Sequence, residues 1–183
     1  VGMPLAGVDL RITNPETCST LKDGAVGQIE VRGPNVFVGY WNMPEKTREE
    51  LREDGFFITG DLGFIDDQGY VQIVGRNKDL IIAGGYNIYP KEIELILDDQ
   101  PGVLESAVIG VPHADFGESV VGVLVPDNSS LIDLEKITES VTASLANFKQ
   151  PRKLVVVDAL PRNAMGKVQK NILRDTYGSA NSS

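Results

Sequence analysis

Short alternating segments dominate the first 76 residues of the chain. Segments with apolar residues in alternation or in short runs occur at 8–12, 28–32, 56–58, 64–65 and 70–74. Alternation of this kind is typical of strands with one buried face, and turn signals such as Asp-Gly and Gly-Pro separate the segments. Only 44–52 has the composition of a helix, and it is short and highly charged. We therefore expect a strand-rich, antiparallel piece of a barrel or sheet.

After Tyr89 the pattern changes to strands that alternate with helices. Strands are predicted at 104–111, where Pro112 ends the run, at 119–125 and at 154–157. Apolar residues at spacings of three and four predict an amphipathic helix through Leu134, Ile137, Val141, Leu145 and Phe148. A closing helix is predicted at 168–177, and residues 178–183 are expected to be a disordered tail. The fold class expected for 77–183 is a small, compact α+β domain.

The two patterns meet in the segment 75–94, which reads GRNKDLIIAGGYNIYPKEIE. An apolar run within it ends at the pair Gly84-Gly85. Residue chemistry alone predicts a strand, a glycine turn and a helix that begins at Pro90, because proline is favoured at the first helical position. The predicted boundary between a unit at 1–76 and a unit at 77–183 falls in this segment.

Composition narrows the class of protein. The 183 residues include 42% apolar and 23% charged residues, which is typical of a globular chain, and no apolar run is long enough for a membrane helix. We recognise no signal peptide. Cys18 is the only cysteine, so an intrachain disulfide is impossible and a cytoplasmic location is expected. The net charge of −9 argues against nucleic-acid binding.

Positive charge is concentrated between Lys149 and Arg174. Seven basic residues and the single acid Asp158 give this segment a local charge of +6. Such a patch on an acidic protein can attract a small anion. A solvated helix face would have the same composition.

Three short patterns could carry chemistry, and each also has a purely structural interpretation. Asp61 follows Thr-Gly and could accept hydrogen bonds from both hydroxyls of a ribose, or it could simply occupy a turn. Lys167 follows the permissive Gly166 and could contact a phosphate, or it could be an ordinary loop lysine. The glycine pair 84–85 could let a thin ligand approach the backbone, and a hairpin turn would need glycine equally.

The order and spacing of these patterns resemble the adenylate-forming superfamily, which includes the acyl-CoA synthetases. Segment 75–94 is similar to its linker motif, and TGDL at 59–62 to its ribose-binding segment. LPRNAMGKV at 160–168 is similar to its final motif, Leu-Pro-x-x-x-x-Gly-Lys. The resemblance extends from residue 1 to about 177. Within the superfamily, malonyl-CoA synthetases are the closest likeness.

This resemblance implies a role for each matching residue. Asp61 and Arg76 would contact the nucleotide ribose, and Lys167 would contact the substrate carboxylate and the α-phosphate during adenylation. Lys78 would be the hinge between the end of a large AMP-binding domain at 1–76 and a small mobile domain at 77–183. The predicted coenzyme A residues are Gly84, Gly85, Tyr86, Phe148, Lys149 and Arg152. Phe148 also ends a predicted core stripe, so a core position and a stacking position both remain open.

The reaction implied is that of an ATP-dependent ligase. A small carboxylic acid and ATP would give acyl-AMP and pyrophosphate, and coenzyme A would then form the thioester, with Mg²⁺ accompanying ATP and no metal site in this chain. The superfamily's phosphate-binding loop and acyl pocket lie upstream of its linker motif, so we expect this chain to need the N-terminal part of the same protein and to be inactive alone. A noncatalytic module that binds coenzyme A or a partner is the alternative. Lys167 would also be a target for a lysine acetyltransferase, because acetylation removes its charge.

Overall fold

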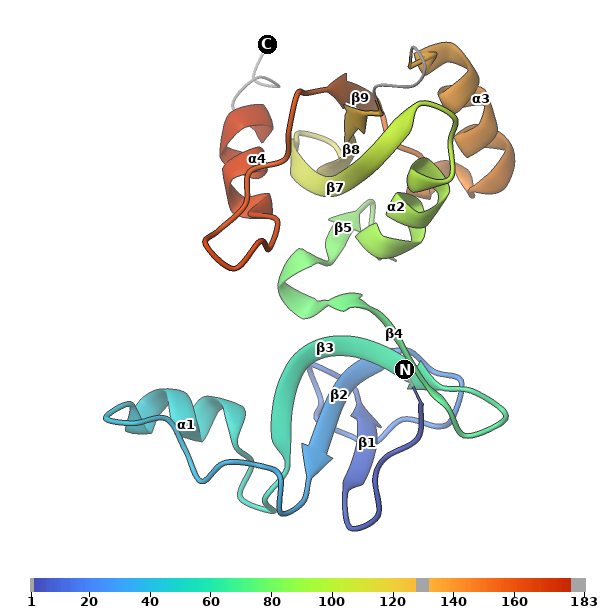
Figure 1. Ribbon diagram of the computed structural model, residues 1–183. Helices are drawn as coiled ribbons and strands as arrows, with labels where there is room; N and C mark the ends of the chain where they lie inside the picture. Colours follow the sequence, from blue (N-terminus) through green and yellow to red (C-terminus); the bar gives the residue numbers. More distant parts are fainter. Residues whose placement is uncertain (1, 128–131, 179–183) are drawn as a thin grey trace. The chain divides into compact units, whose positions relative to one another are not determined.

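A computed structural model describes residues 2–127 and 132–178, and the chain divides into two compact units, Val1–Lys78 and Asp79–Ser183 (Figure 1). The first unit is an open, antiparallel four-stranded sheet with the order β1-β2-β3-β4, and it forms no closed barrel among the described residues. Its elements are β1 (Asp9–Thr13), β2 (Gly27–Arg32), α1 (Pro44–Glu50), β3 (Phe57–Ile65) and β4 (Val71–Arg76).

The predicted strand at 64–65 and all but the first residue of the one at 56–58 belong to one nine-residue strand, β3. The pairing register between β3 and β4 shifts between Leu62 and Gly63, and β3 continues through this irregularity. Gly63 is required there because a Cβ at this position would lie 2.3 Å from the Gln72 carbonyl oxygen. The alternation of apolar and polar residues does not reveal that β3 is one strand, because the register shift interrupts the two-residue period of the side chains.

A buried carboxylate lies beside the small apolar core of this sheet, which Ile12, Ile29 and Val71 form. Glu30 on β2 is fully buried. Its Oε2 accepts a hydrogen bond from Arg11 Nε at 2.8 Å, and its Oε1 accepts one from Arg52 Nη2 at 2.8 Å. Burial alone would raise the pKa of Glu30, but its hydrogen bonds to these two guanidiniums and to a threonine hydroxyl outweigh burial and lower it.

The second unit contains a five-stranded mixed sheet with helices on both faces. Its strand order is β6-β5-β8-β7, and β9 pairs with β8 in parallel. Its elements, after the 3₁₀ turn η1 (Asn77–Asp79) at the boundary, are β5 (Ile81–Ala83), β6 (Tyr86–Ile88), α2 (Pro90–Asp98), β7 (Val103–His113), β8 (Gly117–Pro126), α3 (Leu134–Ser144), the 3₁₀ turn η2 (Asn147–Lys149), β9 (Lys153–Val156) and α4 (Lys170–Gly178).

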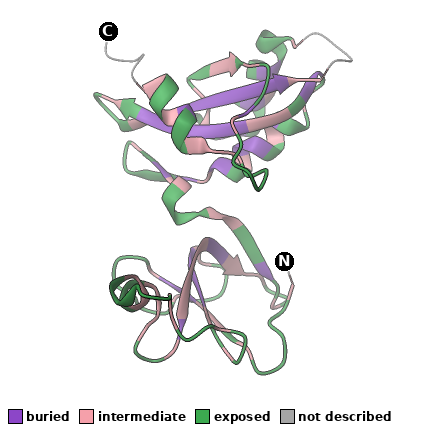
Figure 2. Ribbon diagram, turned by 60° about the vertical axis from the view of Figure 1, so that its left-hand side comes forward, coloured by how far each residue is buried: buried purple, intermediate pink, exposed green. Residues whose placement is uncertain are grey.

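The central residues of the two long strands β7 and β8 are buried on both faces, and Figure 2 shows them in the buried colour. One face carries the core of α2 and α3, with Ile93, Leu97 and Ile137 fully or almost fully buried. The other face packs against α4 through Leu173 and against the segment around Leu160. The α+β class expected for this unit is therefore confirmed.

Several element boundaries differ from the sequence predictions. β7 does not end before Pro112, because it is an edge strand of the described sheet and an edge position tolerates the missing N–H. α3 ends at Ser144 and does not reach Phe148, which is 40% exposed in η2, so of the two alternatives left open for Phe148 the core position is wrong. The Gln150 side-chain amide donates to the carbonyls of Thr142 and Leu145 and thereby satisfies groups at this helix end.

The predicted disordered tail lies mostly outside the described residues. Gly178, its first residue, is the last residue of α4, so it is helical rather than disordered. Residues 179–183 are not described.

Candidate functional site

Asp61 and Arg76 are neighbours across strands β3 and β4 of the first unit. They are direct partners in the register, and Arg76 Nε lies 3.1 Å from Asp61 Oδ1. Thr59 Oγ1 accepts a hydrogen bond from the Asp61 backbone N–H at 3.1 Å, and the Gln28 side chain donates to the Asp61 carbonyl oxygen at 3.2 Å. These contacts hold the backbone at Asp61. The Asp61 carboxylate, an acceptor, and the Arg76 guanidinium, a donor, therefore lie side by side and could both bind adjacent hydroxyls of a sugar.

Lys78 is exposed in η1, at the boundary between the two units. The next residue, Asp79, belongs to the second unit and accepts a 2.8 Å hydrogen bond from Arg174 Nη2 on α4. The second unit is therefore anchored from its first residue onward. Lys78 is the last residue before this anchor.

Gly84 and Gly85 form the two-residue turn of the β5–β6 hairpin. Both have positive φ, +58° and +82°, as the common hairpin turn requires at both central positions. β6 was not predicted from the sequence, because its three residues are too few for a pattern. The turn alone therefore accounts for both glycines, and a Cβ at Gly85 would meet no other atom within 4 Å.

A pocket of about 420 Å³ adjoins this turn. Four of the six predicted coenzyme A residues line it: Gly84, Tyr86, Phe148 and Arg152. The rings of Tyr86 and Phe148 stack with centroids 4.4 Å apart and planes inclined by 22°. The Arg152 guanidinium lies 4.4 Å from the centroid of the Phe116 ring. The pocket thus combines flat apolar surfaces with one guanidinium.

The other two predicted coenzyme A residues do not line this pocket. Gly85 is the second residue of the turn and is not among the residues that line the pocket. Lys149 is ion-paired with Glu92 on α2, and its Nζ lies 2.7 Å from Glu92 Oε1. The carboxylate of Glu92 thus compensates the Lys149 ammonium outside the pocket. Among the described residues that line the pocket, Arg152 is the basic one.

Among the other lining residues, sequence reasoning missed an aromatic residue and an acid, Phe116 and Glu118. Glu118 Oε2 accepts a 2.7 Å hydrogen bond from the Ile82 backbone N–H and so ties β5 to β8 beside the pocket. Neither residue belongs to a recognisable motif in HADFGE at 113–118, and both come to the pocket through the pairing of β8 with β5, which is distant in sequence.

Lys167 is exposed on the loop that precedes α4. Asn163 Oδ1 accepts hydrogen bonds from the backbone N–H groups of Met165 and Lys167, at 3.0 and 2.9 Å. Gly166 between them has a φ of +78°. Among the described residues, the Lys167 ammonium has no hydrogen-bond or ion-pair partner, although its backbone is held.

The local charge of +6 between residues 149 and 174 is largely compensated in the fold. Four of its seven basic residues form ion pairs with acids from outside the segment: Lys149 with Glu92, Arg162 with Glu105, Lys170 with Glu94 and Arg174 with Asp79. Arg152, Lys153 and Lys167 are without an acidic partner among the described residues. The basic segment is therefore mainly a set of structural ion pairs, with three cations left over.

Neither a metal cluster nor a membrane helix is found in the described part of the chain. No group of three or more His, Cys, Asp or Glu side chains is placed to hold a metal ion at residues 2–127 and 132–178. Every helix in these residues is too short or too polar to span a bilayer.

Comparison with known proteins identifies the family. Residues 92–167 match the family model of the AMP-binding enzyme C-terminal domain. The chain carries an AMP-binding enzyme C-terminal domain. Its relatives are acyl-CoA ligases: the malonate–CoA ligase of Arabidopsis thaliana is 39% identical over 95% of this chain and 30% of its own length. A putative acyl–CoA ligase of Bacillus subtilis, YdaB, is 38% identical over 95% of this chain and 34% of its own length.

Solved structures support the same assignment. ATP-bound MatB from Rhodopseudomonas palustris is 60% identical and matches with a TM-score of 0.93 over 98% of this chain and 36% of MatB. This chain spans about a third of the length of the curated relatives it matches. The match to the adenylate-forming fold is confirmed, and so is the likeness to malonyl-CoA synthetases.

Proposed function

We propose that this chain is the C-terminal part of an AMP-forming acyl-CoA ligase that activates a small carboxylic acid. The observation that carries the proposal is the Lys167 ammonium, which is unpartnered among the described residues and extends from a held backbone. Adenylation brings a carboxylate against an anionic phosphate, so a positioned cation stabilises the charge that develops on the transferring group. Malonate is the first candidate substrate, because the relatives include a malonate–CoA ligase.

The ribose of ATP would bind at Asp61 and Arg76. The carboxylate would accept from one hydroxyl and the guanidinium would donate to another, so their present contact would open to admit the sugar. Magnesium would accompany ATP, because Mg²⁺ in such sites commonly takes phosphate oxygens of the substrate as ligands.

Coenzyme A would use the pocket beside the glycine turn. Its volume of about 420 Å³ falls in the range of small-molecule sites, ~300 to 1,000 Å³. Phe148 and Tyr86 offer a surface for the adenine ring, and Arg152 offers a charge for a phosphate. Lys149 would contribute only if its pairing with Glu92 opened. Gly84 and Gly85 would let the pantetheine arm pass close to the backbone.

The small domain would rotate about Lys78 between the two half-reactions, presenting Lys167 first and the glycine turn second. Lys78 suits a pivot, since it is exposed at the unit boundary and directly precedes the Asp79–Arg174 anchor. The large domain that completes the ATP and acyl sites would be the N-terminal part of the same protein, and the 183 residues alone would be inactive.

The decisive experiment compares the two half-reactions of the complete gene product. Lys167→Ala should lower pyrophosphate release by about 10²- to 10³-fold, the usual effect of losing one such charge-stabilising group. Thioester formation from supplied acyl-AMP should be retained. Lys153→Ala is the matched control, because it removes another unpaired lysine of the same segment. Equal loss of both half-reactions in Lys167→Ala would contradict the assignment.

A noncatalytic module is the second candidate, because the aromatic pocket could bind coenzyme A without any adenylation. Calorimetry with coenzyme A, together with a pyrophosphate-release screen over short carboxylic acids, separates the two. Binding without pyrophosphate release for any acid would favour the module. Acetylation of Lys167 by a lysine acetyltransferase would regulate the ligase only, and peptide mass spectrometry of the protein from its native cells would detect it.

A further inference from the structure

The loop that carries Lys167 is exposed, and its own contacts close it into a compact turn. Residues 162–167 are all exposed to solvent. Arg162 and Val168 form an isolated antiparallel bridge, and the Asn163 N–H donates to the Lys167 carbonyl oxygen at 3.0 Å. These contacts give the loop a shape. They do not fix its position relative to the sheet.

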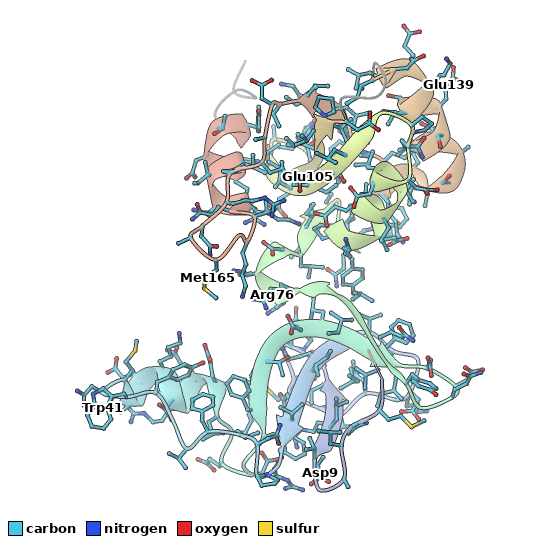
Figure 3. The ribbon with its side chains drawn as sticks, viewed as in Figure 1. Asp9, Trp41, Arg76, Glu105, Glu139 and Met165 are labelled. Atoms are coloured by element: carbon cyan, nitrogen blue, oxygen red, sulfur yellow. The ribbon has the colours of Figure 1, made fainter. Side chains whose placement is uncertain are left out.

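Two ion pairs supply that anchorage, one at each end of the loop. At the start, the Arg162 guanidinium pairs with Glu105 on β7 through Nη2 and donates through Nη1 to the Gly166 carbonyl oxygen at 2.6 Å. At the end, Lys170 Nζ lies 2.6 Å from Glu94 Oε1 on α2. Figure 3 labels Glu105 on its strand and Met165 at the tip of this loop.

The two anchors differ in burial, and this separates their roles. The side chains of Lys170 and Glu94 are only 17% and 10% exposed, and Glu94 Oε1 also accepts from the Val108 N–H of the edge strand β7. Breaking that pair would leave a buried charge and destabilise the unit. The side chains of Arg162 and Glu105 are 42% and 31% exposed, and a pair so accessible to water contributes ~0 to 1 kcal/mol to stability.

We propose that Arg162 is a positioning residue for adenylation: by bridging Glu105 and the Gly166 carbonyl, it holds the backbone from which Lys167 extends. The inference rests on the proposed ligase function. Its physical basis is that both hydrogen-bonding arms of one rigid guanidinium are used, one on the sheet and one on the residue immediately before Lys167. Lysine could not replace it, because a single ammonium lacks this fork geometry.

The test uses Arg162→Ala, Arg162→Lys, Glu105→Ala and the double variant Arg162→Ala/Glu105→Ala in the complete protein. A misplacement of about 1 Å at a reacting centre can lower the rate ~10²-fold. In each single variant, kcat for pyrophosphate release should therefore fall about 10- to 100-fold. The KM values for ATP and the carboxylate should change less than about threefold, and thioester formation from supplied acyl-AMP should persist. The double variant should be no worse than Arg162→Ala, because both changes remove one bridge.

Hydrogen exchange read by mass spectrometry gives a measurement independent of activity. Arg162→Ala should speed exchange in the peptide covering 163–168 while leaving the melting temperature within about 2 °C of the wild type, as expected for an exposed pair. Lys153→Ala is the charge control and should change neither exchange nor kcat.

Each contrary result has a distinct meaning. If Arg162→Ala is impaired and Glu105→Ala is not, Arg162 contacts the substrate itself and the positioning role is wrong. If Lys167→Ala loses adenylation but Arg162→Ala keeps it, the positioning inference fails and the ligase function stands. If the wild-type protein releases no pyrophosphate with any acid, the ligase function and this inference fail together.

Discussion

The buried carboxylate of Glu30 should make the folding of the first unit depend on pH. Glu30→Gln keeps the shape of the side chain and removes its charge. Removing one partner of a buried ion pair typically lowers the free energy of unfolding by ~3 to 5 kcal/mol, because the charge that remains is no longer compensated. The side chains of Arg11 and Arg52 remain 24% and 29% exposed, so water can partly solvate them. We therefore expect a loss near the lower limit, about 3 kcal/mol at pH 7.

The sign of the pH dependence follows from the lowered pKa of Glu30. A carboxyl whose pKa is lower in the folded state than its ordinary value of 4.5 stabilises the fold above that value. The contribution is lost as the pH falls through the folded-state pKa. The difference in free energy of unfolding between wild type and Glu30→Gln should thus stay constant from neutral pH down to about pH 5 and shrink below it.

Urea titrations followed by the backbone amide signals of β2 and β3 would measure this difference for the first unit alone. Asp9→Asn is the matched control, because Asp9 pairs with Arg32 at 2.8 Å but both side chains are well exposed, 62% and 47%. It should change stability by less than about 1 kcal/mol. The reasoning is refuted if Glu30→Gln costs no more than Asp9→Asn, or if its cost is the same at pH 3 as at pH 7.

Two further predictions concern the complete gene product and rest on the proposed ligase function. Phe148→Ala should raise the KM for coenzyme A roughly 5- to 150-fold, the equivalent of ~1 to 3 kcal/mol of base stacking, and Phe148→Trp should restore it; an unchanged KM in steady-state kinetics would remove Phe148 from the site. Lys78→Pro should slow one half-reaction and spare the other, because proline restricts φ at the proposed pivot, whereas Lys78→Ala should slow neither; equal turnover in both variants would rule out the pivot.

The sequence contains most of the architecture because the long strands and helices have strong local patterns. Pro90 begins α2 as expected, and the alternating segments at the start of the chain do form an antiparallel sheet. The errors occur where a non-local contact overrides the pattern. α3 ends before Phe148 because Gln150 folds back onto the helix end, and no periodicity reveals a cap from a residue beyond the helix.

The candidate site was only partly accessible to the same reasoning. Motif order pointed to Lys167 and the glycine turn, and the structure gathers Gly84, Tyr86, Phe148 and Arg152 around one pocket. Phe116 and Glu118 could not be assigned, because their relevance depends on β8 lying beside β5, a pairing between distant segments. The burial of Glu30 was not predicted either. A polar residue in an alternating strand indicates solvent exposure, and its partners Arg11 and Arg52 are distant in sequence.

Charge shows most clearly what a linear sequence leaves out. Counted along the chain, Lys149, Arg162, Lys170 and Arg174 belong to the same basic segment as Lys167. In the fold each of these four meets an acid from 79 to 105, and Lys167 meets none among the described residues. An ammonium that must reach a transferring phosphate cannot also be committed to a carboxylate, because breaking that pair would add to the barrier. The fold therefore compensates four neighbouring charges, two of which anchor the loop at its ends, and leaves Lys167 available.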